Sequence, residues 1–395
     1  MANILSISDI KFFPVRSGDQ RTTFELCRYL ASKGHKIVIA TIEGNDTLTI
    51  KTNKKLDWLD SHYRIKSPLY RYPFGIIFNI LRKFYLIIFK LTVKQPFVLT
   101  RLELNKLNEI INKEEIDTLL IHRAHLGRYV KFISNRKAMF KVLQAHDLQY
   151  MRDQRFQKYR RNTINKRQSK FIKVEIEILN MFDIVIDLAD YEALDLKKRG
   201  INGELIYSNG SPVECEEYCG FRKDSTYDLL FVGSDIFQNR VSIKWFLQNV
   251  WNFIDYEQKR LAIAGTISHW KKLRKYNGNT DLLGEYDDIR QLYKNCKMVI
   301  APLVVGSGTK VKVIEALMNS KPVITNNLGI EGINLKANKE YFHCEKPSEW
   351  ISTINNLIND DNKLKNVGKN AWIWASKNAT VENVYGEFEK IICSR

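Results

Sequence analysis

The stretch Ile300-Ala-Pro-Leu-Val-Val-Gly-Ser-Gly-Thr-Lys-Val-Lys-Val-Ile-Glu-Ala-Leu317 decides the fold expected for this chain. Its apolar first part belongs to a buried strand predicted over residues 298–305, and a tight Gly306-Ser-Gly308 turn follows. The helix predicted after this turn carries three charged side chains: Lys310, Lys312 and Glu315. A strand, a short turn and a helix in this order form the repeating unit of a parallel α/β sheet.

The turn between strand and helix has the composition of an anion-binding site. Neither glycine carries a Cβ, so the backbone can approach a ligand closely. The helix start offers unpaired N–H groups and a positive dipole end, which suit a phosphate. The lysines add positive charge, and the carboxylate of Glu315 could hold sugar hydroxyls. The pattern fits a diphosphate-and-ribose site and also an ordinary packing corner, because it matches neither common phosphate-binding glycine motif.

Outward from this stretch, short apolar runs alternate with helical patterns along the whole chain. A helix predicted over residues 19–33 ends at Gly34, and strands precede and follow it. The predicted strands span residues 4–8, 35–41, 118–122, 141–146, 183–187, 229–233, 261–265, 298–301 and 322–325. Strand–helix–strand repeats predict parallel pairing with right-handed crossovers. We therefore expect two doubly wound, Rossmann-like α/β halves that change over near residues 207–212.

Length and composition agree with two globular domains. The 395 residues exceed one typical core, and 44% hydrophobic with 11% aromatic residues exclude a disordered chain. The six cysteines form no zinc-binding pattern, which favours reduced thiols in a cytosolic protein. The first residues lack a basic region followed by a long apolar one, so no signal peptide is predicted.

Positive charge dominates the chain, whose formal net charge is +18. Residues 150–173 hold nine basic side chains and one acidic one. Such a cluster could contact nucleic acid, anionic lipid or a phosphorylated substrate, or it could be a solvated helix face. A nucleic-acid-binding protein would explain the charge, but no helix-turn-helix, finger or RNA-binding strand motif is present.

Residues 73–96 form an apolar segment that basic side chains interrupt. No uninterrupted run reaches the length of a transmembrane helix. On a helix, the basic residues Arg82, Lys83, Lys90 and Lys94 fall within an arc of roughly 120°. This pattern favours a helix on an anionic membrane surface; the alternative is a helix packed on the first domain.

The run from Gly306 to Leu317, followed by Lys321-Pro-Val-Ile-Thr325 and Gly329-Ile-Glu-Gly332, resembles the donor-site segment of retaining glycosyltransferases of family 4. The resemblance covers most of the chain. It implies the GT-B fold, in which two Rossmann-like domains face a central cleft and the C-terminal helix crosses back to the first domain. The domains expected are 1–207, which binds the acceptor, 208–376, which binds the nucleotide-sugar donor, and 377–395, the returning helix.

The resemblance also implies which residues contact the donor. Ser17-Gly18 matches the family's glycine loop, Asn209-Gly210 its hinge, and residues 283–288 the loop that reads the nucleotide base. The implied donor-binding residues are Gly18, Gly233, Arg240, Gly265, Glu285, Tyr286, Gly306, Ser307, Gly308, Thr309 and Lys310.

Three residues are expected to carry the chemistry. His146, at the end of a predicted strand, resembles the family's active-site histidine and would position the donor sugar. Lys312 would neutralise the departing diphosphate, and Glu315 would hold the ribose. Ligands of α/β sheets bind at the carboxyl ends of parallel strands, which independently favours His146 as a site residue.

These features predict a metal-independent, retaining hexosyltransferase that acts on a nucleotide diphosphate sugar as substrate and needs no cofactor. The expected acceptor is a lipid-linked or surface-glycan precursor, as in capsule, polysaccharide or lipopolysaccharide synthesis. The expected location is the cytoplasm, with peripheral contact on the inner face of the membrane and no nucleic-acid partner. A sugar-nucleotide-binding protein without catalysis is the alternative, because Ser307 stands where many family members carry a glutamate.

Overall fold

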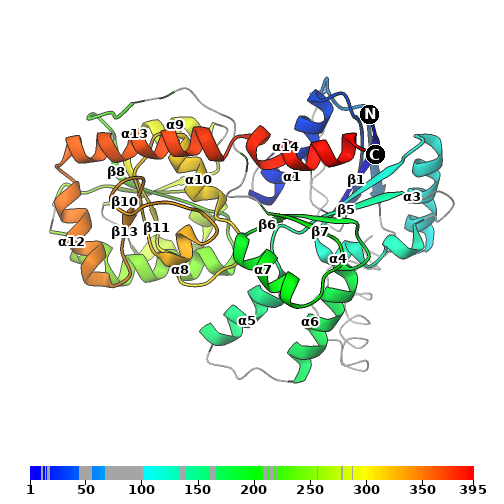
Figure 1. Cartoon of the computed structure of the whole chain (residues 1–395). Coiled ribbons are helices and arrows are strands. Elements are labelled where there is room, and N and C mark those ends of the chain that lie inside the picture. The colour runs from blue at the N-terminus through cyan, green and yellow to red at the C-terminus, as the bar shows by residue number, and fades with distance from the viewer. Residues whose placement is uncertain are drawn as a thin grey trace. The chain divides into compact units, whose positions relative to one another are not determined.

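The chain forms two compact α/β units in a computed structural model (Figure 1). The first unit comprises Met1–Ser208 and Tyr385–Arg395, and the second comprises Asn209–Val384. The structure describes residues 1–9, 12–13, 15, 18–43, 56–66, 99, 101–133, 139–160, 166–207, 212, 218, 220–255, 257–276, 279–286 and 288–395. The predicted amphipathic segment 73–96 lies outside these residues, as do Ser17 and Asn209-Gly210.

Seven parallel strands form the sheet of the first unit, in the order β3-β2-β1-β4-β5-β6-β7. Their bounds are β1 (Asn3–Ser8), β2 (Lys36–Glu43), β3 (Ser61–Lys66), β4 (Thr118–His122), β5 (Phe140–Gln144), β6 (Ile184–Leu188) and β7 (Glu204–Tyr207). From β1 the chain adds β2 and β3 on one side and then β4 to β7 on the other, so the strand order reverses between β1 and β4. In a doubly wound sheet, the carboxyl ends of the strands at such a reversal are where ligands bind.

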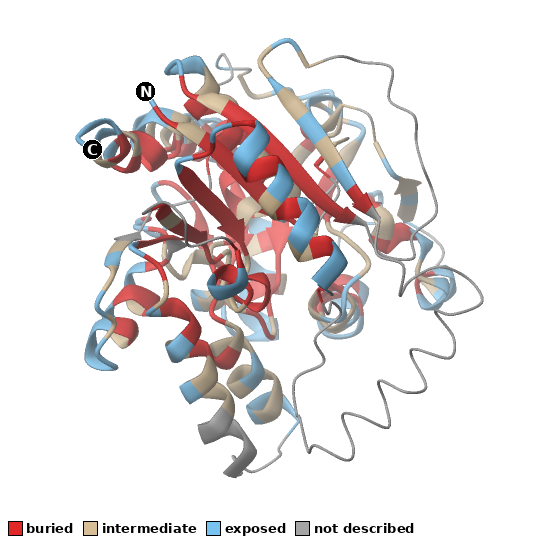
Figure 2. Cartoon of the chain, turned by 90° about the vertical axis from the view of Figure 1, so that its right-hand side faces the viewer, coloured by how far each residue is buried: buried red, intermediate tan, exposed pale blue. Residues whose placement is uncertain are grey.

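Helices cover the first sheet and bury its apolar strands. Figure 2 shows the buried strands in red, with helices whose outward faces are exposed. The helices are α1 (Gly18–Ser32), α3 (Arg101–Lys113), α4 (Ala124–Gly127), α5 (Gln149–Tyr159), α6 (Lys166–Leu179) and α7 (Asp190–Lys198), with the 3₁₀ turn η2 (Val130–Phe132). Central strands such as β4 are buried along their full length, as expected for a parallel sheet covered on both faces.

The second unit has a six-stranded parallel sheet in the order β10-β9-β8-β11-β12-β13. The strands are β8 (Tyr227–Val232), β9 (Leu261–Ala264), β10 (Thr280–Gly284), β11 (Cys296–Ala301), β12 (Val323–Thr325) and β13 (Phe342–His343). Here the reversal lies between β8 and β11. The loops after these two strands are therefore the expected ligand-binding loops of this unit.

The second sheet is covered by two apolar clusters, one on each side. The helices of this unit are α8 (Phe237–Asn249), α9 (Ile289–Lys294), α10 (Val311–Met318), α11 (Asn327–Ile330), α12 (Pro347–Leu357) and α13 (Asp361–Asn378), with 3₁₀ turns η3 (Trp251–Phe253), η4 (Thr266–His269) and η5 (Lys271–Lys275). The fully buried Trp350 of α12 packs edge-on against Phe246 of α8, so the two helices share one core.

The last helix, α14 (Val381–Cys393), begins in the second unit and continues into the first from Tyr385 onward. Its buried Tyr385, Phe388 and Ile392 recur at helical spacing and form its inward face. At its end, the imidazole of His35 lies 3.8 Å from the carboxylate of Glu389. The predicted return of the C-terminal helix to the first domain is confirmed.

The predicted fold class, two parallel doubly wound α/β sheets, is confirmed, and every strand that the apolar runs predict is present. Two local expectations are wrong. The strand predicted over residues 298–305 begins at Cys296 and ends at Ala301, because Pro302 has no N–H to donate to a neighbouring strand. Lys310 does not lie within the following helix but directly before it, since α10 begins at Val311.

Candidate functional site

The loop after β11 brings glycines and charged side chains to the reversal point of the second sheet. Gly308 has a left-handed φ of +66°, which favours glycine at this turn. Lys310 is buried, and its ammonium donates to the carbonyl of Gly308. Gly306, Ser307 and Thr309 lie in the same loop, directly before the first N–H groups of α10. This arrangement is suited to an anion at the start of the helix.

Lys312 lies in the first turn of α10, where its side chain reaches back toward β8. Its ammonium donates to Oδ1 of Asn239 at 2.6 Å and lies 4.8 Å from the centroid of the Phe231 ring. Desolvation by the surrounding protein and repulsion by Lys310 lower the pKa of Lys312 to about 8, although the charge of Glu315 opposes this shift. Lys312 is therefore an amine that gives up its proton within an accessible pH range.

Glu315 lies one turn further along α10 and is buried, with 9% of its surface exposed. A carboxylate at such a position requires polar partners, because an isolated buried charge is costly. The charge of Glu315 raises the pKa of Lys312, so the two side chains interact electrostatically across one helical turn. The structure thus brings both second-unit residues of the predicted catalytic set to one side of the same short helix.

Three glycines end neighbouring strands of the second sheet and are called the glycine floor below. Gly233, Gly265 and Gly284 stand at the carboxyl ends of the adjacent strands β8, β9 and β10. Gly265 has a φ of +91°, and a Cβ there would lie 2.4 Å from the carbonyl oxygen of Gly233. Its N–H donates to the carbonyl of Gly284 at 2.7 Å. Gly265 therefore cannot be replaced without displacing the neighbouring backbone, whereas a Cβ at Gly233 would lie 2.9 Å from Nδ2 of the Asn239 side chain.

The remaining predicted donor residues of this unit lie near the same edge. Arg240 of α8 forms an ion pair with Asp235, and its guanidinium lies 5.6 Å from the centroid of the Trp270 ring. A phosphate at Arg240 would have to compete with this carboxylate. Glu285 and Tyr286 directly follow β10, and Tyr286 packs against the core. Glu285 and Tyr286 therefore lie at the carboxyl end of β10, which is an edge strand of the second sheet.

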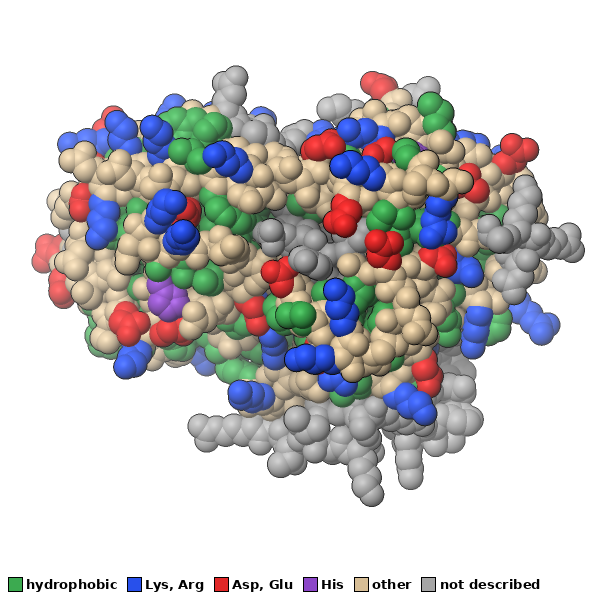
Figure 3. Space-filling model, viewed as in Figure 1, with side chains coloured by type: hydrophobic (Ala, Val, Ile, Leu, Met, Phe, Trp, Pro, Cys, Tyr) green, Lys and Arg blue, Asp and Glu red, His purple; other side chains and the backbone are tan. Residues whose placement is uncertain are grey.

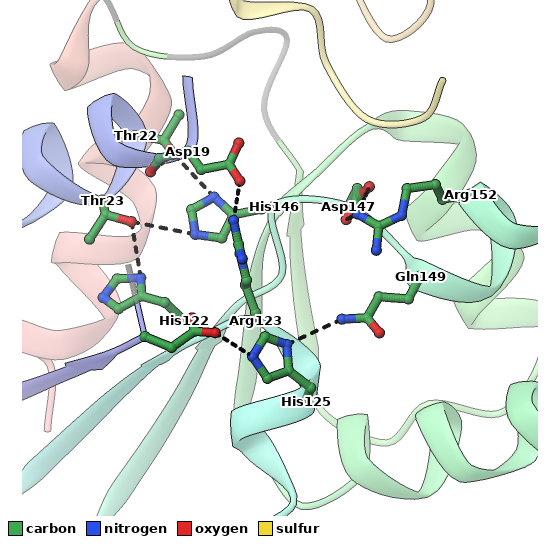
Figure 4. A network of polar contacts seen from close by, with 11 residues as sticks. Asp19, Thr22, Thr23, His122, Arg123, His125, His146, Asp147, Gln149 and Arg152 are labelled. Carbon is green, nitrogen blue, oxygen red and sulfur yellow. Dashed lines mark hydrogen bonds and ion pairs between the residues drawn. The ribbon is translucent and has the colours of Figure 1, made fainter. Parts of the chain in front are cut away.

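Histidines gather at the reversal point of the first sheet (Figure 4). His122 ends β4 and is fully buried, and His146 follows β5 with a left-handed φ of +62°. Nδ1 of His146 lies 3.1 Å from Oγ1 of Thr22, and its Nε2 lies 3.4 Å from Oγ1 of Thr23. Both threonines belong to α1. A non-glycine residue with positive φ at a strand end is a conformation found at functional sites.

Acidic residues surround these rings. Arg123, which also has a positive φ, forms an ion pair with Asp19 in the first turn of α1. On the other side, Nε2 of His125 lies 2.8 Å from the carboxylate of Asp9. Gly18, the predicted glycine-loop residue, is the first residue of α1 and directly precedes Asp19. The first unit therefore supplies cations, carboxylates and neutral imidazoles at one sheet edge.

The two central imidazoles are neutral at physiological pH. Desolvation, together with a smaller contribution from His146, lowers the pKa of His122 to about 3. Desolvation also lowers the pKa of His146 to about 4, with Asp19 opposing this shift. Neutral rings can both donate and accept a hydrogen bond, so they suit the recognition of hydroxyl groups.

Sequence reasoning identified His146 but missed the other polar residues of this network: Asp9, Asp19, Thr22, Thr23, His122, Arg123, His125 and Gln144. A signal was present, because His122 ends a predicted buried strand and His125 follows it by three residues. Side chains at the end of a parallel strand lie at the ligand-binding edge of the sheet. Applying this rule to the strand over residues 118–122 would have found two more histidines.

The basic cluster of residues 150–173 is partly engaged by the protein itself. Arg152 forms an ion pair of 3.1 Å with Asp147, and the guanidinium of Arg155 lies 5.2 Å from the centroid of the Tyr191 ring. Figure 3 shows basic and acidic side chains interspersed on the face in view. The described arginines of this cluster therefore have intramolecular roles as well as adding to the net charge.

One group among the described residues has the composition of a metal site: His35, Glu389 and Cys393. Nδ1 of His35 accepts a hydrogen bond from the backbone N–H of Ala2 at 3.1 Å. In a neutral imidazole the other nitrogen must then carry the proton. Nε2 therefore faces Glu389 and Cys393 as a donor and has no lone pair for a cation, so these residues form a packing contact.

None of the helices in the described part of the chain is long and apolar enough to cross a membrane. The predicted surface-binding segment 73–96 lies outside this part, so membrane contact stays a prediction.

Part of the second unit matches a known protein family. Residues 226–360 match the model of the family described as glycosyl transferases group 1. A 44.6 kDa protein in the cps region of Klebsiella pneumoniae is 22% identical, and the alignment covers 99% of this chain and all of that protein. The family match contains the glycine floor, the loop after β11 and α10.

Solved structures resemble the chain over nearly its full length. Sucrose-phosphate synthase from Thermosynechococcus elongatus superposes with a TM-score of 0.70 at 14% identity, covering 99% of this chain and 98% of that one. HepE from Anabaena, in complex with UDP and glucose, gives 0.67 at 13% identity with full coverage of both chains. WaaG, a glycosyltransferase involved in lipopolysaccharide biosynthesis, gives 0.65 at 11% identity, covering 98% and 99%. These likenesses show a shared fold.

Proposed function

We propose that this protein is a retaining glycosyltransferase, because residues 226–360 match the group 1 glycosyltransferase family and the whole chain has the GT-B fold. It transfers a hexose from a nucleotide diphosphate sugar to a hydroxyl group of an acceptor. In this reaction the bond from the anomeric carbon to the diphosphate breaks, a bond from that carbon to the acceptor oxygen forms, and the acceptor hydroxyl releases its proton.

The observation that carries the proposal is the group of residues at the reversal point of the second sheet. The loop after β11, the start of α10 and Lys312 offer positive charge at the place where a diphosphate would leave. Preorganised donors of this kind stabilise developing negative charge, and each is typically worth several kcal/mol. No metal ion is needed in this scheme, because the lysines and the helix dipole supply the positive charge. Glu315 would accept hydrogen bonds from the ribose hydroxyls.

His146 is proposed to contact the donor sugar. Its ring is neutral, so it can accept a hydrogen bond from a sugar hydroxyl without a charge penalty. The contact of its Nε2 with Thr23 is long, at 3.4 Å, so a ligand hydroxyl can compete for this nitrogen. Arg123 and Asp19 fix the edge of the first sheet beside this ring.

Uracil is the base that we propose for the donor nucleotide. HepE from Anabaena, which shares the fold, was solved with UDP, with UDP-glucose, and with UDP and glucose. The base would contact backbone groups of Glu285 and Tyr286, beyond the carboxyl end of β10. Thermal shift with UDP-, GDP- and dTDP-sugars tests this choice, because a ligand that binds the native state raises the melting temperature.

The acceptor is proposed to be a lipid-linked or surface-glycan precursor at the inner face of the membrane. Support comes from the relative in a Klebsiella cps region and from the fold shared with WaaG. The basic and apolar segment 73–96 would provide the membrane contact. Flotation with liposomes that contain or lack anionic lipid tests this part, and absence of binding to both would contradict it.

The catalytic proposal is tested by nucleotide release from an activated sugar, measured for the full chain and three variants. Lys312→Ala and Glu315→Ala should each lower the rate by about 10²-fold or more. Lys365→Ala, which removes an exposed lysine of α13, is the matched control and should retain full activity. Activity that survives in both site variants would argue against the assignment. Calorimetric binding of the nucleotide without any turnover would instead favour the non-catalytic alternative that Ser307 suggests.

A further inference from the structure

Tyr385 connects the returning helix to the histidines of the first unit. It is the first residue of the C-terminal segment in this unit, directly after Val384, and its side chain is buried. Its hydroxyl lies 3.3 Å from the backbone carbonyl oxygen of Thr22 and 3.2 Å from Nε2 of Gln144. One phenol thus contacts both α1 and the end of β5, the two elements that hold His146.

The direction of these hydrogen bonds follows from their chemistry. A carbonyl oxygen can only accept, so Tyr385 donates its hydroxyl proton to Thr22. The hydroxyl oxygen then accepts from the amide of Gln144, and this fixes Oε1 of Gln144 toward Nδ1 of His122, at 2.6 Å. Nδ1 of His122 must therefore carry the proton. Its Nε2 is left as an acceptor for Oγ of Ser6, at 2.8 Å.

The same reasoning determines the ring of His146. Oγ1 of Thr22 donates to the carbonyl of Asp19 at 3.1 Å, so it accepts from Nδ1 of His146. Nε2 of His146 therefore has the lone pair and accepts from Oγ1 of Thr23. Thr23 is also 3.5 Å from Nδ1 of His122, so it lies between the two rings, whose centroids are 5.9 Å apart.

We propose that Tyr385 is a positioning residue for the sugar-binding histidine, which it controls through Gln144, His122 and Thr23. The role in catalysis rests on the proposed function. The fixed tautomers do not, because they follow from the contacts alone. Without the phenol hydroxyl, the amide of Gln144 loses the acceptor that favours its present orientation, and a rotation by 180° would move the proton of His122 from Nδ1 to Nε2.

The location of Tyr385 gives this network a second role. Residues 381–384 of α14 belong to the second unit, and the next residue carries the hydroxyl that orients Gln144. A displacement of the helix at this point would alter the hydrogen bonds to Thr22 and Gln144 first. Under the proposal, such a displacement would change the proton position on His122.

The test compares the full-length protein with Tyr385→Phe and with Tyr276→Phe as the matched control. The hydroxyl of Tyr276 is also buried but has no hydrogen-bond partner among the described residues, and it lies in the second unit. Long-range ¹H–¹⁵N spectra of ¹⁵N-histidine-labelled protein report which ring nitrogen carries the proton. Turnover of the UDP-sugar is measured in parallel for each protein.

In the wild-type protein and in Tyr276→Phe, His122 and His146 should both be protonated at Nδ1. In Tyr385→Phe, His122 should become a mixture of tautomers, and kcat should fall about two- to tenfold with an unchanged KM, the loss expected for one hydrogen bond. A wild-type His122 protonated at Nε2, or an unchanged His122 in Tyr385→Phe, would overturn the proposal. If no protein turns over a sugar donor, the proposed function fails. The histidine spectra still test whether Tyr385 fixes the tautomer of His122.

Discussion

The ammonium of Lys312 lies 2.6 Å from Oδ1 of Asn239, and Nδ2 of Asn239 donates to the carbonyl of Ser234 at 2.8 Å. Because a carbonyl can only accept, the amide of Asn239 has one orientation, with its oxygen toward the lysine. Asn239 also fills the space where a Cβ of Gly233 would lie. The lysine is therefore positioned from the far side of the reversal point, through α8 and the end of β8.

Activity should decrease at alkaline pH because of Lys312. The pKa of this amine is lowered to about 8 by desolvation, then by Lys310, so the free enzyme loses this positive charge as the pH rises through that value. The ratio kcat/KM reports ionisation in the free enzyme. We expect kcat/KM for the donor to fall above about pH 8, as measured in a pH profile of nucleotide release.

Lys312→Arg provides the control for this profile. The guanidinium stays charged throughout the range, so the alkaline decrease should disappear even if the maximal rate is lower. A decrease that persists unchanged in Lys312→Arg would assign the titration to another group.

An alanine substitution should destabilise the protein more at Gly265 than at Gly284. Gly265→Ala combines a φ of +91° and ψ of −178° with a Cβ 2.4 Å from a carbonyl oxygen, and the conformation alone costs about 1–3 kcal/mol. Gly284→Ala has a similar φ of +77° but open space around the Cβ, so it should cost about 1–2 kcal/mol. Urea unfolding of both variants measures the difference. Equal losses would show that the close approach to Gly233 contributes nothing.

His146 should be replaceable without loss of the fold but not without loss of turnover. Its φ of +62° is tolerated by asparagine, which adopts the left-handed conformation more readily than most residues. His146→Asn should therefore change the free energy of unfolding by no more than about 1 kcal/mol. The same variant should lose about 10²-fold in kcat. Valine at this position is the contrast, because a β-branched side chain at positive φ is strained and should destabilise the protein as well. Full turnover in His146→Asn would remove the ring from the site.

Acid should destabilise the first unit through His122. The pKa of this buried ring is about 3 in the folded protein and 6.5 in the unfolded chain. Between these values the unfolded chain binds the extra proton, so the stability is fully present above about pH 6.5 and is lost as the pH falls toward about 3. Each unit of pKa difference corresponds to about 1.4 kcal/mol, so the loss should reach several kcal/mol.

His122→Gln tests this assignment, since an amide can hydrogen-bond to Gln144 but does not titrate. The slope of unfolding free energy against pH between about 5 and 7 should be smaller in this variant than in the wild type. Identical slopes would place the acid sensitivity elsewhere.

The fold could be predicted from the sequence because its central strands are continuous apolar runs, such as Thr118–His122 and Leu261–Ala264. Four strands were not predicted, β3, β7, β10 and β13, and all four lie at the edges of their sheets. Ser61–Lys66 alternates polar and apolar residues at a sheet edge, and Phe342–His343 has only two residues. Their pairing is set by neighbouring strands and not by local composition.

The site could be predicted only in part. The loop after β11 was visible because its glycines, lysines and glutamate are contiguous in the sequence. The partners of His146 were not, because Thr22 and Thr23 are more than a hundred residues away and carry no pattern of their own. The role of Lys312 was indicated by its type, but its low pKa arises from tertiary packing around Phe231 and Asn239.

The contact between Gly265 and the carbonyl of Gly233 has a consequence for engineering. Substitution libraries aimed at a different nucleotide or sugar will yield mostly misfolded clones if they randomise these two positions. Diversity is better directed to Ser307, Thr309 and Glu285, whose side chains occupy loops rather than the junction of two strands. The backbone at Gly233 and Gly265 has to stay unchanged, so a new specificity has to come from the surrounding loops.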